Sequence, residues 1–277
     1  MQLLPFSNEN VSIKSQEGLL SLKTNFIFLK MKIYFLGTNG WYSTSLGNTT
    51  CTLIDSDFHY IILDAGDGLY KLDEHVLSSK PIILFLSHIH LDHIIGLHIL
   101  SKFRFKQDIM IYCDKGTKSL LKSIIKHPYT CPFSHLPMNI RFFEFGEGNY
   151  SRQLDFTAKY LVHSDKCMGY RLNIEKKVIS YCTDTGVCDN LYTLAQDADL
   201  LISECSYKPG QEEWGWPHLK PEEIAKVAEE SNVKQLYLTH FDASIFPSKD
   251  ARKSARDQAR PIFPSTYIAY DNLEFSL

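Results

Sequence analysis

Three features that often define a protein class are missing from this sequence of 277 residues. No apolar run reaches the roughly 18 residues that a membrane-spanning helix needs, so we expect no membrane partner. The formal charge of −3 provides no basic field for tight nonspecific binding of nucleic acid. The seven cysteines are odd in number and include no CxxC pair, which argues against a disulfide scaffold or a zinc ribbon. They are typical of reduced thiols, and we therefore expect a cytoplasmic protein.

The beginning of the sequence also lacks a signal-peptide layout. Residues 1–30 do not show the order of basic, apolar and small residues that such a peptide has. A regular strand pattern begins directly after them, with Met31-Lys-Ile-Tyr-Phe-Leu-Gly. We therefore predict an N-terminal extension over 1–30 and one compact domain over 31–277.

Apolar runs bounded by turn residues predict strands in an early and a later block, each followed by helices. This order predicts two sheets packed face to face with helices outside, an α+β fold with four αββα layers. The predicted strands are 32–36, 50–55, 58–63, 82–87, 109–113, 139–145, 154–162, 169–174, 177–182, 199–203, 235–239, 266–270 and 273–276. The predicted helices are 69–78, 93–105, 118–126, 189–196, 221–231 and 249–259.

The segment Phe85–Gly96 holds the densest group of potential metal ligands. It places His88, His90, Asp92 and His93 within six residues, after the apolar run that predicts a strand. Side chains alternate along a strand, so His88 and His90 point the same way. Asp92 falls at the N-cap of the predicted helix, and His93 enters its first turn. The strand end and the helix start each present a pair of ligands, which suits two adjacent metal ions.

Three more polar residues each follow an apolar run that predicts a strand. They are His163, Asp184 and His240. With the first cluster they make seven nitrogen and oxygen ligands, enough for two divalent metal ions. We expect zinc, with manganese and iron as the alternatives.

With these residues the chain resembles the metallo-β-lactamase superfamily, over nearly all of 31–277. The matching residues are the seven ligands and Asp64 in the turn Leu63–Gly68. The resemblance implies that Asp64 braces the ligand loop, a role that matters for ligand orientation. It also implies two groups of ligands, with Asp184 as the bridge between them. The first group is His88, His90 and His163, and the second is Asp92, His93 and His240.

Several segments look most like the ribonuclease Z branch of that superfamily and its smaller phosphodiesterase relatives. His218 falls where this branch has a histidine that protonates the leaving group, and Glu204 where it has a glutamate that orients the histidine. Asp92 is expected to orient the attacking hydroxide. A plainer interpretation of His218 is a residue at the entry of the predicted helix 221–231. The matching segments are Val162–Arg171, Cys182–Gly186, Asp199–Cys205 and Leu238–Phe241.

Two departures from the ribonuclease Z pattern favour a smaller substrate. That family carries a long tRNA-binding arm between the third and fourth motifs, whereas 20 residues separate His163 from Asp184 here. The loop 37–44 also lacks the usual proline and Arg-Asn pair. We therefore expect a phosphodiesterase acting on a small or nucleotide-like phosphodiester, with RNA as a less favoured partner and a homodimer left open. The alternatives are a ribonuclease Z-type tRNA 3′-processing endonuclease, a thioester or lactone hydrolase, and a noncatalytic metal-binding protein.

Five other side chains are candidate substrate contacts. Three cations could bind phosphate, although each is more readily explained as a solvated surface charge. Two tryptophans could stack on a nucleobase, although each is equally explained as a loop anchor packed on the core. These residues are Lys166, Arg171, Lys208, Trp214 and Trp216.

Overall fold

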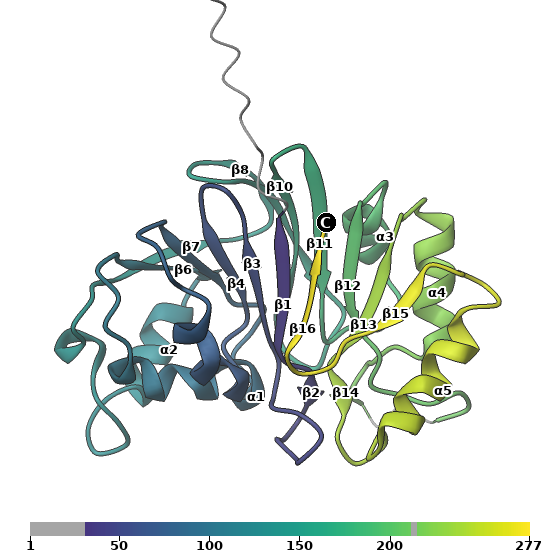
Figure 1. Ribbon diagram of the computed structural model, residues 1–277, viewed down its shortest axis with the longest axis horizontal. Helices are drawn as coiled ribbons and strands as arrows, with labels where there is room; N and C mark the ends of the chain where they lie inside the picture. The colour runs from purple at the N-terminus through teal and green to yellow at the C-terminus, as the bar shows by residue number, and fades with distance from the viewer. Residues whose placement is uncertain (1–30, 212–214) are drawn as a thin grey trace, which may run out of the picture.

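The computed structural model describes residues 31–211 and 215–277. The predicted extension over 1–30 and Trp214 lie outside the described residues. Two seven-stranded sheets face each other, with helices on the outer side of each (Figure 1). The predicted four-layer αββα sandwich is confirmed. None of the helices described is long and apolar enough to cross a membrane.

The first sheet is built mainly from the N-terminal half of the chain and is covered by α1 and α2 (Figure 1). Its helices are α1 (Leu91–Ile94), α2 (Thr117–Ile124) and the 3₁₀ segments η1 (Asp67–Glu74), η2 (Ile95–Lys102) and η3 (Phe133–His135). Its strands, in spatial order, are β16 (Leu273–Ser276), β1 (Lys32–Gly37), β3 (Cys51–Asp55), β4 (Tyr60–Leu63), β5 (Ile82–Phe85), β6 (Ile109–Asp114) and β7 (Ile140–Phe145).

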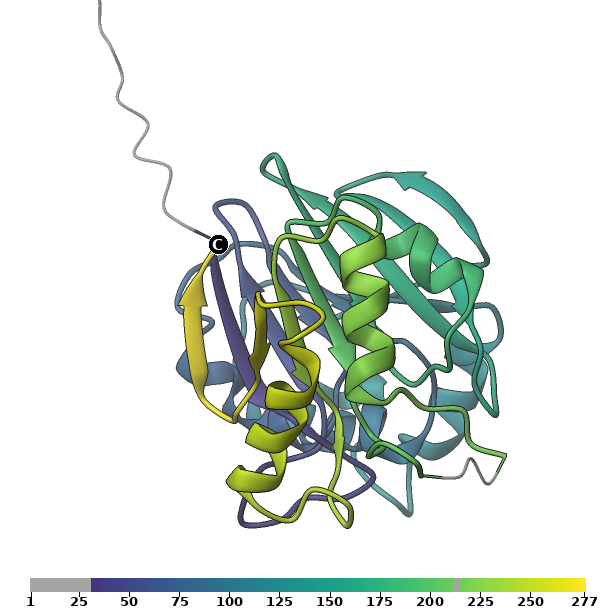
Figure 2. The same ribbon diagram turned by 90° about the vertical axis from the view of Figure 1, so that its right-hand side faces the viewer.

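The second sheet comes from the C-terminal half, and Figure 2 looks onto the helices that cover it. These helices are α3 (Asp189–Ala195), α4 (Pro221–Glu230) and α5 (Lys249–Ala259). The strands, in spatial order, are β15 (Thr266–Ile268), β13 (Leu236–Thr239), β12 (Leu200–Glu204), β11 (Lys177–Cys182), β10 (Cys167–Ile174), β9 (Asp155–Leu161) and β8 (Gly148–Ser151). A short parallel pair, β2 (Asn39–Gly40) and β14 (Phe241–Asp242), links the two halves.

Alternation along the strands explains the layers. In β1, Ile33 and Phe35 belong to the core between the sheets, whereas Tyr34 and Leu36 belong to the core under the helices of the first sheet. A strand buried on both faces needs apolar residues at every position, because successive side chains point to opposite faces. The continuous apolar runs of the sequence are therefore the inner strands of this sandwich.

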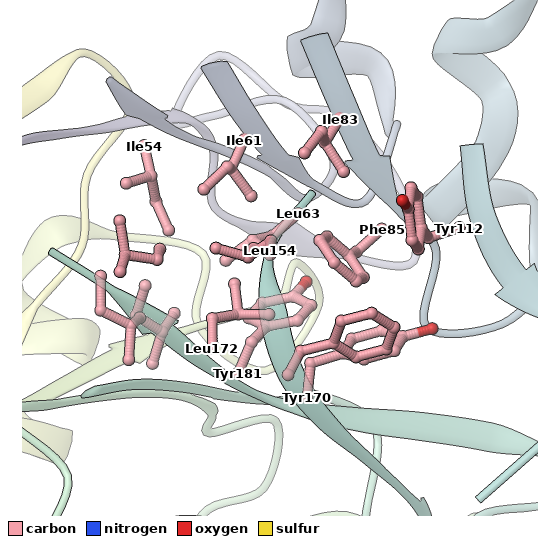
Figure 3. Packing of buried hydrophobic residues seen from close by; sticks show 14 of the residues in the cluster. Ile54, Ile61, Leu63, Ile83, Phe85, Tyr112, Leu154, Tyr170, Leu172 and Tyr181 are labelled. Carbon is pink, nitrogen blue, oxygen red and sulfur yellow. The ribbon is translucent and has the colours of Figure 1, made fainter. Parts of the chain in front are cut away.

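The core between the sheets is rich in aromatic rings (Figure 3). Phe85 of β5 lies with its ring centroid 5.0 Å from that of Tyr170 in β10. Two tyrosines also make polar contacts across this core. The hydroxyl of Tyr170 donates to the Leu86 carbonyl at 2.5 Å, and that of Tyr181 donates to the Asp64 carboxylate at 2.7 Å. The second sheet thus holds the loop that follows β5 and the turn that follows β4.

The predicted helix 93–105 is wrong in type, because α1 ends at Ile94 and the chain continues as the 3₁₀ segment η2. The Gly96 N–H donates to the Ala65 carbonyl at 2.8 Å rather than to a carbonyl one turn back in its own helix. A Cβ at Gly96 would lie 2.3 Å from the Gly66 carbonyl oxygen, so only glycine permits this approach. An apolar period does not reveal such a tertiary contact. The short strands β2, β8 and β14 were also not predicted.

Candidate metal centre

The seven predicted ligands come together at one edge of the sandwich, where strands of both sheets end. His88 and His90 lie in the loop between β5 and α1, and α1 carries Asp92 and His93. The other three follow strands of the second sheet. His163 comes after β9, Asp184 after β11 and His240 after β13. Because β11, β12 and β13 are parallel, their carboxyl ends meet at the same edge.

The first ligand group is compact. The Nδ1 atom of His90 lies 2.8 Å from Nε2 of His88 and 3.3 Å from Nε2 of His163. The Oδ2 atom of Asp184 is 3.7 Å from Nε2 of His88 and 3.7 Å from Nε2 of His163. One ligand atom from each of these four residues lies within 4.8 Å of the others.

The second group is equally close. The Nε2 atoms of His93 and His240 are 3.1 Å apart, and Oδ2 of Asp92 is 3.5 Å and 3.2 Å from them. The Oδ1 atom of Asp184 lies 3.3 Å from Nε2 of His93 and 3.1 Å from Nε2 of His240. One carboxylate therefore turns one oxygen to each group, which is the placement of a residue shared by two cations.

The hydrogen bonds of the histidines fit a metal site. His93 Nδ1 lies 2.7 Å from the Asp64 carboxylate, so Nδ1 donates its proton to Asp64 and Nε2 faces the centre. The Ser206 hydroxyl donates to the His240 carbonyl at 2.7 Å and is therefore the acceptor for His240 Nδ1 at 3.1 Å. Both histidines thus direct Nε2 to the centre, as metal ligands with an outer partner do.

The same holds for His88. The Ser87 hydroxyl donates to Asp64 at 2.7 Å and so accepts from His88 Nδ1 at 3.0 Å. Asp64 is fully buried and directs two ligand histidines at once, one directly and one through Ser87, which fits the bracing role that the resemblance implied. The donor set and the tautomers therefore suit divalent cations.

The backbone at the centre is strained where site residues leave their strands. Asp64, Asp184 and His240 have φ values of 58°, 51° and 49°, in the left-handed region. Such conformations cost about 1 kcal/mol or more for residues other than glycine and collect at functional sites. Gly40 packs against one of these residues, because a Cβ there would lie 2.6 Å from Cε1 of His240.

Asp92 does not cap a helix as predicted. The N-cap of α1 is His90, and Asp92 is the second residue of the helix. Its Oδ2 accepts a hydrogen bond from the Trp41 N–H at 2.8 Å and also faces His240. Burial alone would raise the pKa of Asp92, but the facing His93 and His240 lower it below its ordinary value. The carboxylate is therefore ionised and available as a ligand.

A second pair lies beside the ligands. His218 Nδ1 is 2.8 Å from Oε1 of Glu204, which is fully buried and also accepts the Thr185 N–H at 2.6 Å. The His218 ring centroid is 5.2 Å from that of His163. Burial lowers the pKa of His218, but the Glu204 carboxylate outweighs this and raises it to about 9. His218 thus carries a proton at neutral pH and has Nε2 free of Glu204.

A hollow of about 860 Å³ opens over the two groups. Asp92, Asp184, His218 and His240 line it, together with aromatic side chains. Of the described residues that line it, none is a lysine or an arginine. The hollow is large enough for a nucleotide-sized ligand.

The other candidate contacts are divided between the centre and elsewhere. Trp216 lies at the hollow, with its ring centroid 5.3 Å from that of His90. Arg171 instead donates to the carbonyls of Leu194 and Gln196 at the end of α3, so it is not at the centre. Lys208 lines a different hollow beside α5.

Trp41 and Ser206, which contact ligands, were not predicted. Trp41 bonds Asp92 across 51 positions of sequence, and Ser206 bonds His240 across 34. Neither residue lies in a local pattern of ligands, so no spacing in the sequence pointed to them.

Comparison with known proteins gives a family and several relatives. A family model described as a beta-lactamase superfamily domain matches residues 59–241. A protein named Ribonuclease Z from Streptococcus mutans serotype c is 28% identical over 316 aligned residues, covering 89% of this chain and all of the relative. Another Ribonuclease Z, from Microcystis aeruginosa, is 26% identical and covers 89% of this chain and 96% of the relative. The first alignment is longer than this chain, so that relative has insertions that this chain lacks.

Solved structures share the fold. The metallo-beta-lactamase fold protein YhfI from Bacillus subtilis has a TM-score of 0.75 and 22% identity, covering 90% of this chain and all of that chain. The short form of human tRNase Z has a TM-score of 0.70 and 20% identity, covering 89% of this chain and 99% of that chain. A diphosphatase from the PhnP family has a TM-score of 0.65 and 16% identity, covering 90% of this chain and 98% of that chain.

Proposed function

Because this chain belongs to the metallo-β-lactamase superfamily, in its ribonuclease Z-like branch, and is a metal-dependent hydrolase, we propose that it cleaves phosphodiester bonds in RNA. The observation that carries the proposal is the pair of ligand groups sharing Asp184, with the His218–Glu204 pair in the same hollow. The curated relatives named Ribonuclease Z favour RNA over the small substrate that the sequence alone favoured.

We assign two divalent cations, zinc first, to the seven ligands. His88, His90 and His163 would hold one cation, Asp92, His93 and His240 the other, and Asp184 would contribute to both. When bound, such a pair of ions lowers the pKa of water to near neutrality and withdraws charge from a phosphodiester. Buried imidazole nitrogens with fixed tautomers and ionised carboxylates are the donors that zinc takes in proteins.

The roles of the chain's own residues follow from their contacts. Asp92 faces the centre, where it can accept a hydrogen bond from the attacking water and orient it. His218 gives its Nε2 proton to the departing oxygen, since its Nδ1 is held by Glu204. Glu204 is fixed by the Thr185 N–H and keeps the imidazole ring in one orientation. A poor leaving group such as an RNA hydroxyl needs this proton, so the pair suits an alkyl phosphodiester.

A second candidate, a small phosphodiester, is favoured by one specific observation. The chain between His163 and Asp184 is the β10–β11 hairpin, which turns at Glu175 and Lys176. This connection has no room for an arm that would hold a folded RNA at a distance. A thioester hydrolase would use the same ligands but would make less use of His218, because a thiolate leaves with little need of a proton. A lactone hydrolase would also use the same ligands, and its departing alkoxide would still need a proton.

Substrate comparison tests the proposal. Purified protein loaded with Zn²⁺ or Mn²⁺ is given a precursor tRNA with a 3′ extension, an unstructured RNA, bis(p-nitrophenyl) phosphate, a thioester and a lactone. The proposal predicts endonucleolytic cleavage of RNA that a chelator stops and that the His218→Ala variant largely loses. Hydrolysis of the small diester with both RNAs intact would favour the second candidate, and activity on the thioester or lactone alone would refute both.

A further inference from the structure

Trp41 has an unusual combination of backbone and exposure. It follows β2 with a φ of 69°, and its side chain is 67% exposed. A left-handed conformation is an outlier for a bulky residue, and strain of this kind is kept where the surrounding structure imposes it. Here the Trp41 N–H donates to the Asp92 carboxylate at 2.8 Å. The residue whose N–H reaches a ligand in this conformation also lines the hollow.

Other large apolar side chains are exposed near Trp41. Leu91, which lies between two ligands, is also 67% exposed, and Trp216 is 49% exposed. Both line the same hollow, as does Ile245. Large apolar side chains exposed together beside a reactive centre mark a binding surface rather than a packing defect.

The chemistry of the lining selects the kind of ligand. Among the described lining residues no lysine or arginine is present to bind a second phosphate. Asp242 and Ser244 also line the hollow, and because the Ser244 hydroxyl donates to Asp242 Oδ1 at 2.6 Å, the Asp242 carboxylate is the main polar group that this pair offers. A planar ring with polar edges fits such a lining, because an indole stacks on any base through its π-face and needs no fixed hydrogen-bond pattern.

We propose that Trp41 is the stacking platform of a nucleobase subsite, which takes the base of the nucleotide next to the scissile phosphate. Leu91 and Trp216 form the other walls of this subsite. The inference rests on the proposed phosphodiesterase function and deepens it, since it makes a base-bearing diester the preferred substrate. Trp41 acts on specificity, while its backbone N–H separately positions Asp92.

Two diesters with the same leaving group separate these effects. Thymidine 5′-(p-nitrophenyl phosphate) carries a base, and methyl p-nitrophenyl phosphate does not. The readout is the ratio of kcat/KM for the first to that for the second. Trp41→Ala should lower this ratio about tenfold, within the range of one base stack. Trp41→Phe should keep most of it, and both variants retain the N–H that bonds Asp92.

Phe58→Ala is the matched control, because Phe58 is 65% exposed in the turn between β3 and β4, at the opposite end of the strands from the ligands. In Phe58→Ala the ratio of kcat/KM for the two diesters should stay within about twofold of the wild-type ratio. Equal losses on both diesters in Trp41→Ala would overturn the proposal and assign Trp41 to the support of Asp92. An unchanged ratio with a change from dimer to monomer in size-exclusion chromatography would overturn it in favour of a contact between copies of the chain.

A binding measurement separates this inference from the proposed function. Adenosine 5′-monophosphate should quench the tryptophan fluorescence of the metal-loaded wild type and of Phe58→Ala far more than ribose 5-phosphate does. Trp41→Ala should lose that difference. If neither diester is hydrolysed but this pattern holds, the function fails and the subsite stands. If quenching is the same in Trp41→Ala as in the wild type, the subsite is refuted whatever the activity.

Discussion

Replacing Asp64 by asparagine tests how far the buried carboxylate holds the centre together. Oδ1 accepts the Ser87 N–H at 2.7 Å. Oδ2 lies 2.7 Å from each of three donors, the Ser87 hydroxyl, His93 Nδ1 and the Tyr181 hydroxyl. An asparagine has one carbonyl oxygen and one NH₂ group. Whichever way the amide turns, at least one donor faces the NH₂ group without an acceptor.

The size of the effect follows from these contacts. A buried donor left without an acceptor costs about 1–3 kcal/mol, and the bonds that remain lose their charged acceptor. We therefore expect the free energy of unfolding of the metal-free protein to fall by about 2–4 kcal/mol. His93 also loses the partner that fixes its tautomer, and such outer partners are worth about 10–100-fold in metal affinity.

Urea unfolding of the metal-free protein and competition with a chelator measure the two effects. Asp73→Asn serves as the control, because Asp73 makes an exposed ion pair with Lys102 at 2.8 Å, worth at most about 1 kcal/mol. Metal affinity should be unchanged in that control. If Asp64→Asn matched the control in both stability and metal affinity, the assigned role of Asp64 would be wrong.

The remaining predictions concern catalysis and domain limits. His218→Ala should slow cleavage of an alkyl phosphodiester by about 10²–10⁴, with both metals retained by elemental analysis, and should slow bis(p-nitrophenyl) phosphate much less because that leaving group needs no proton. Equal slowing of both would assign His218 to substrate positioning. The wild-type rate on the alkyl diester should fall as pH rises through the pKa of His218. This pKa should lie at or below about 9, because bound cations add positive charge nearby. A rate that rises through that range would contradict the acid role. A chain starting at Met31 should fold and keep its activity, since the Met31 carbonyl already accepts the Leu277 N–H at 2.9 Å. Insolubility of that chain would show that residues 1–30 are needed.

The sequence predicted the layers well because strands buried on both faces leave long apolar runs. The turn between β10 and β11 at Glu175 and Lys176 was also predicted, because it separates two strand patterns in the sequence. The helix type after Asp92 was not, because the hydrogen bond from Gly96 to Ala65 is a tertiary contact.

In the candidate centre, too, some residues could be predicted from the sequence and others could not. Ligands grouped in a short motif, such as His88 and His90, can be predicted from their spacing. Residues that support them from a distance do not, and Trp41 and Ser206 became visible only once the fold brought them to Asp92 and His240. Arg171 shows the converse, since its charge suggested phosphate binding whereas the structure uses it to hold the end of α3.

Metal stoichiometry tests the central claim most directly. Protein loaded with excess Zn²⁺ and freed of unbound metal should hold two ions per chain by elemental analysis. The His88→Ala and His240→Ala variants should each lose metal from a different group, because Asp184 turns one oxygen to each. A wild-type protein that never holds more than one ion would contradict the two-cation centre.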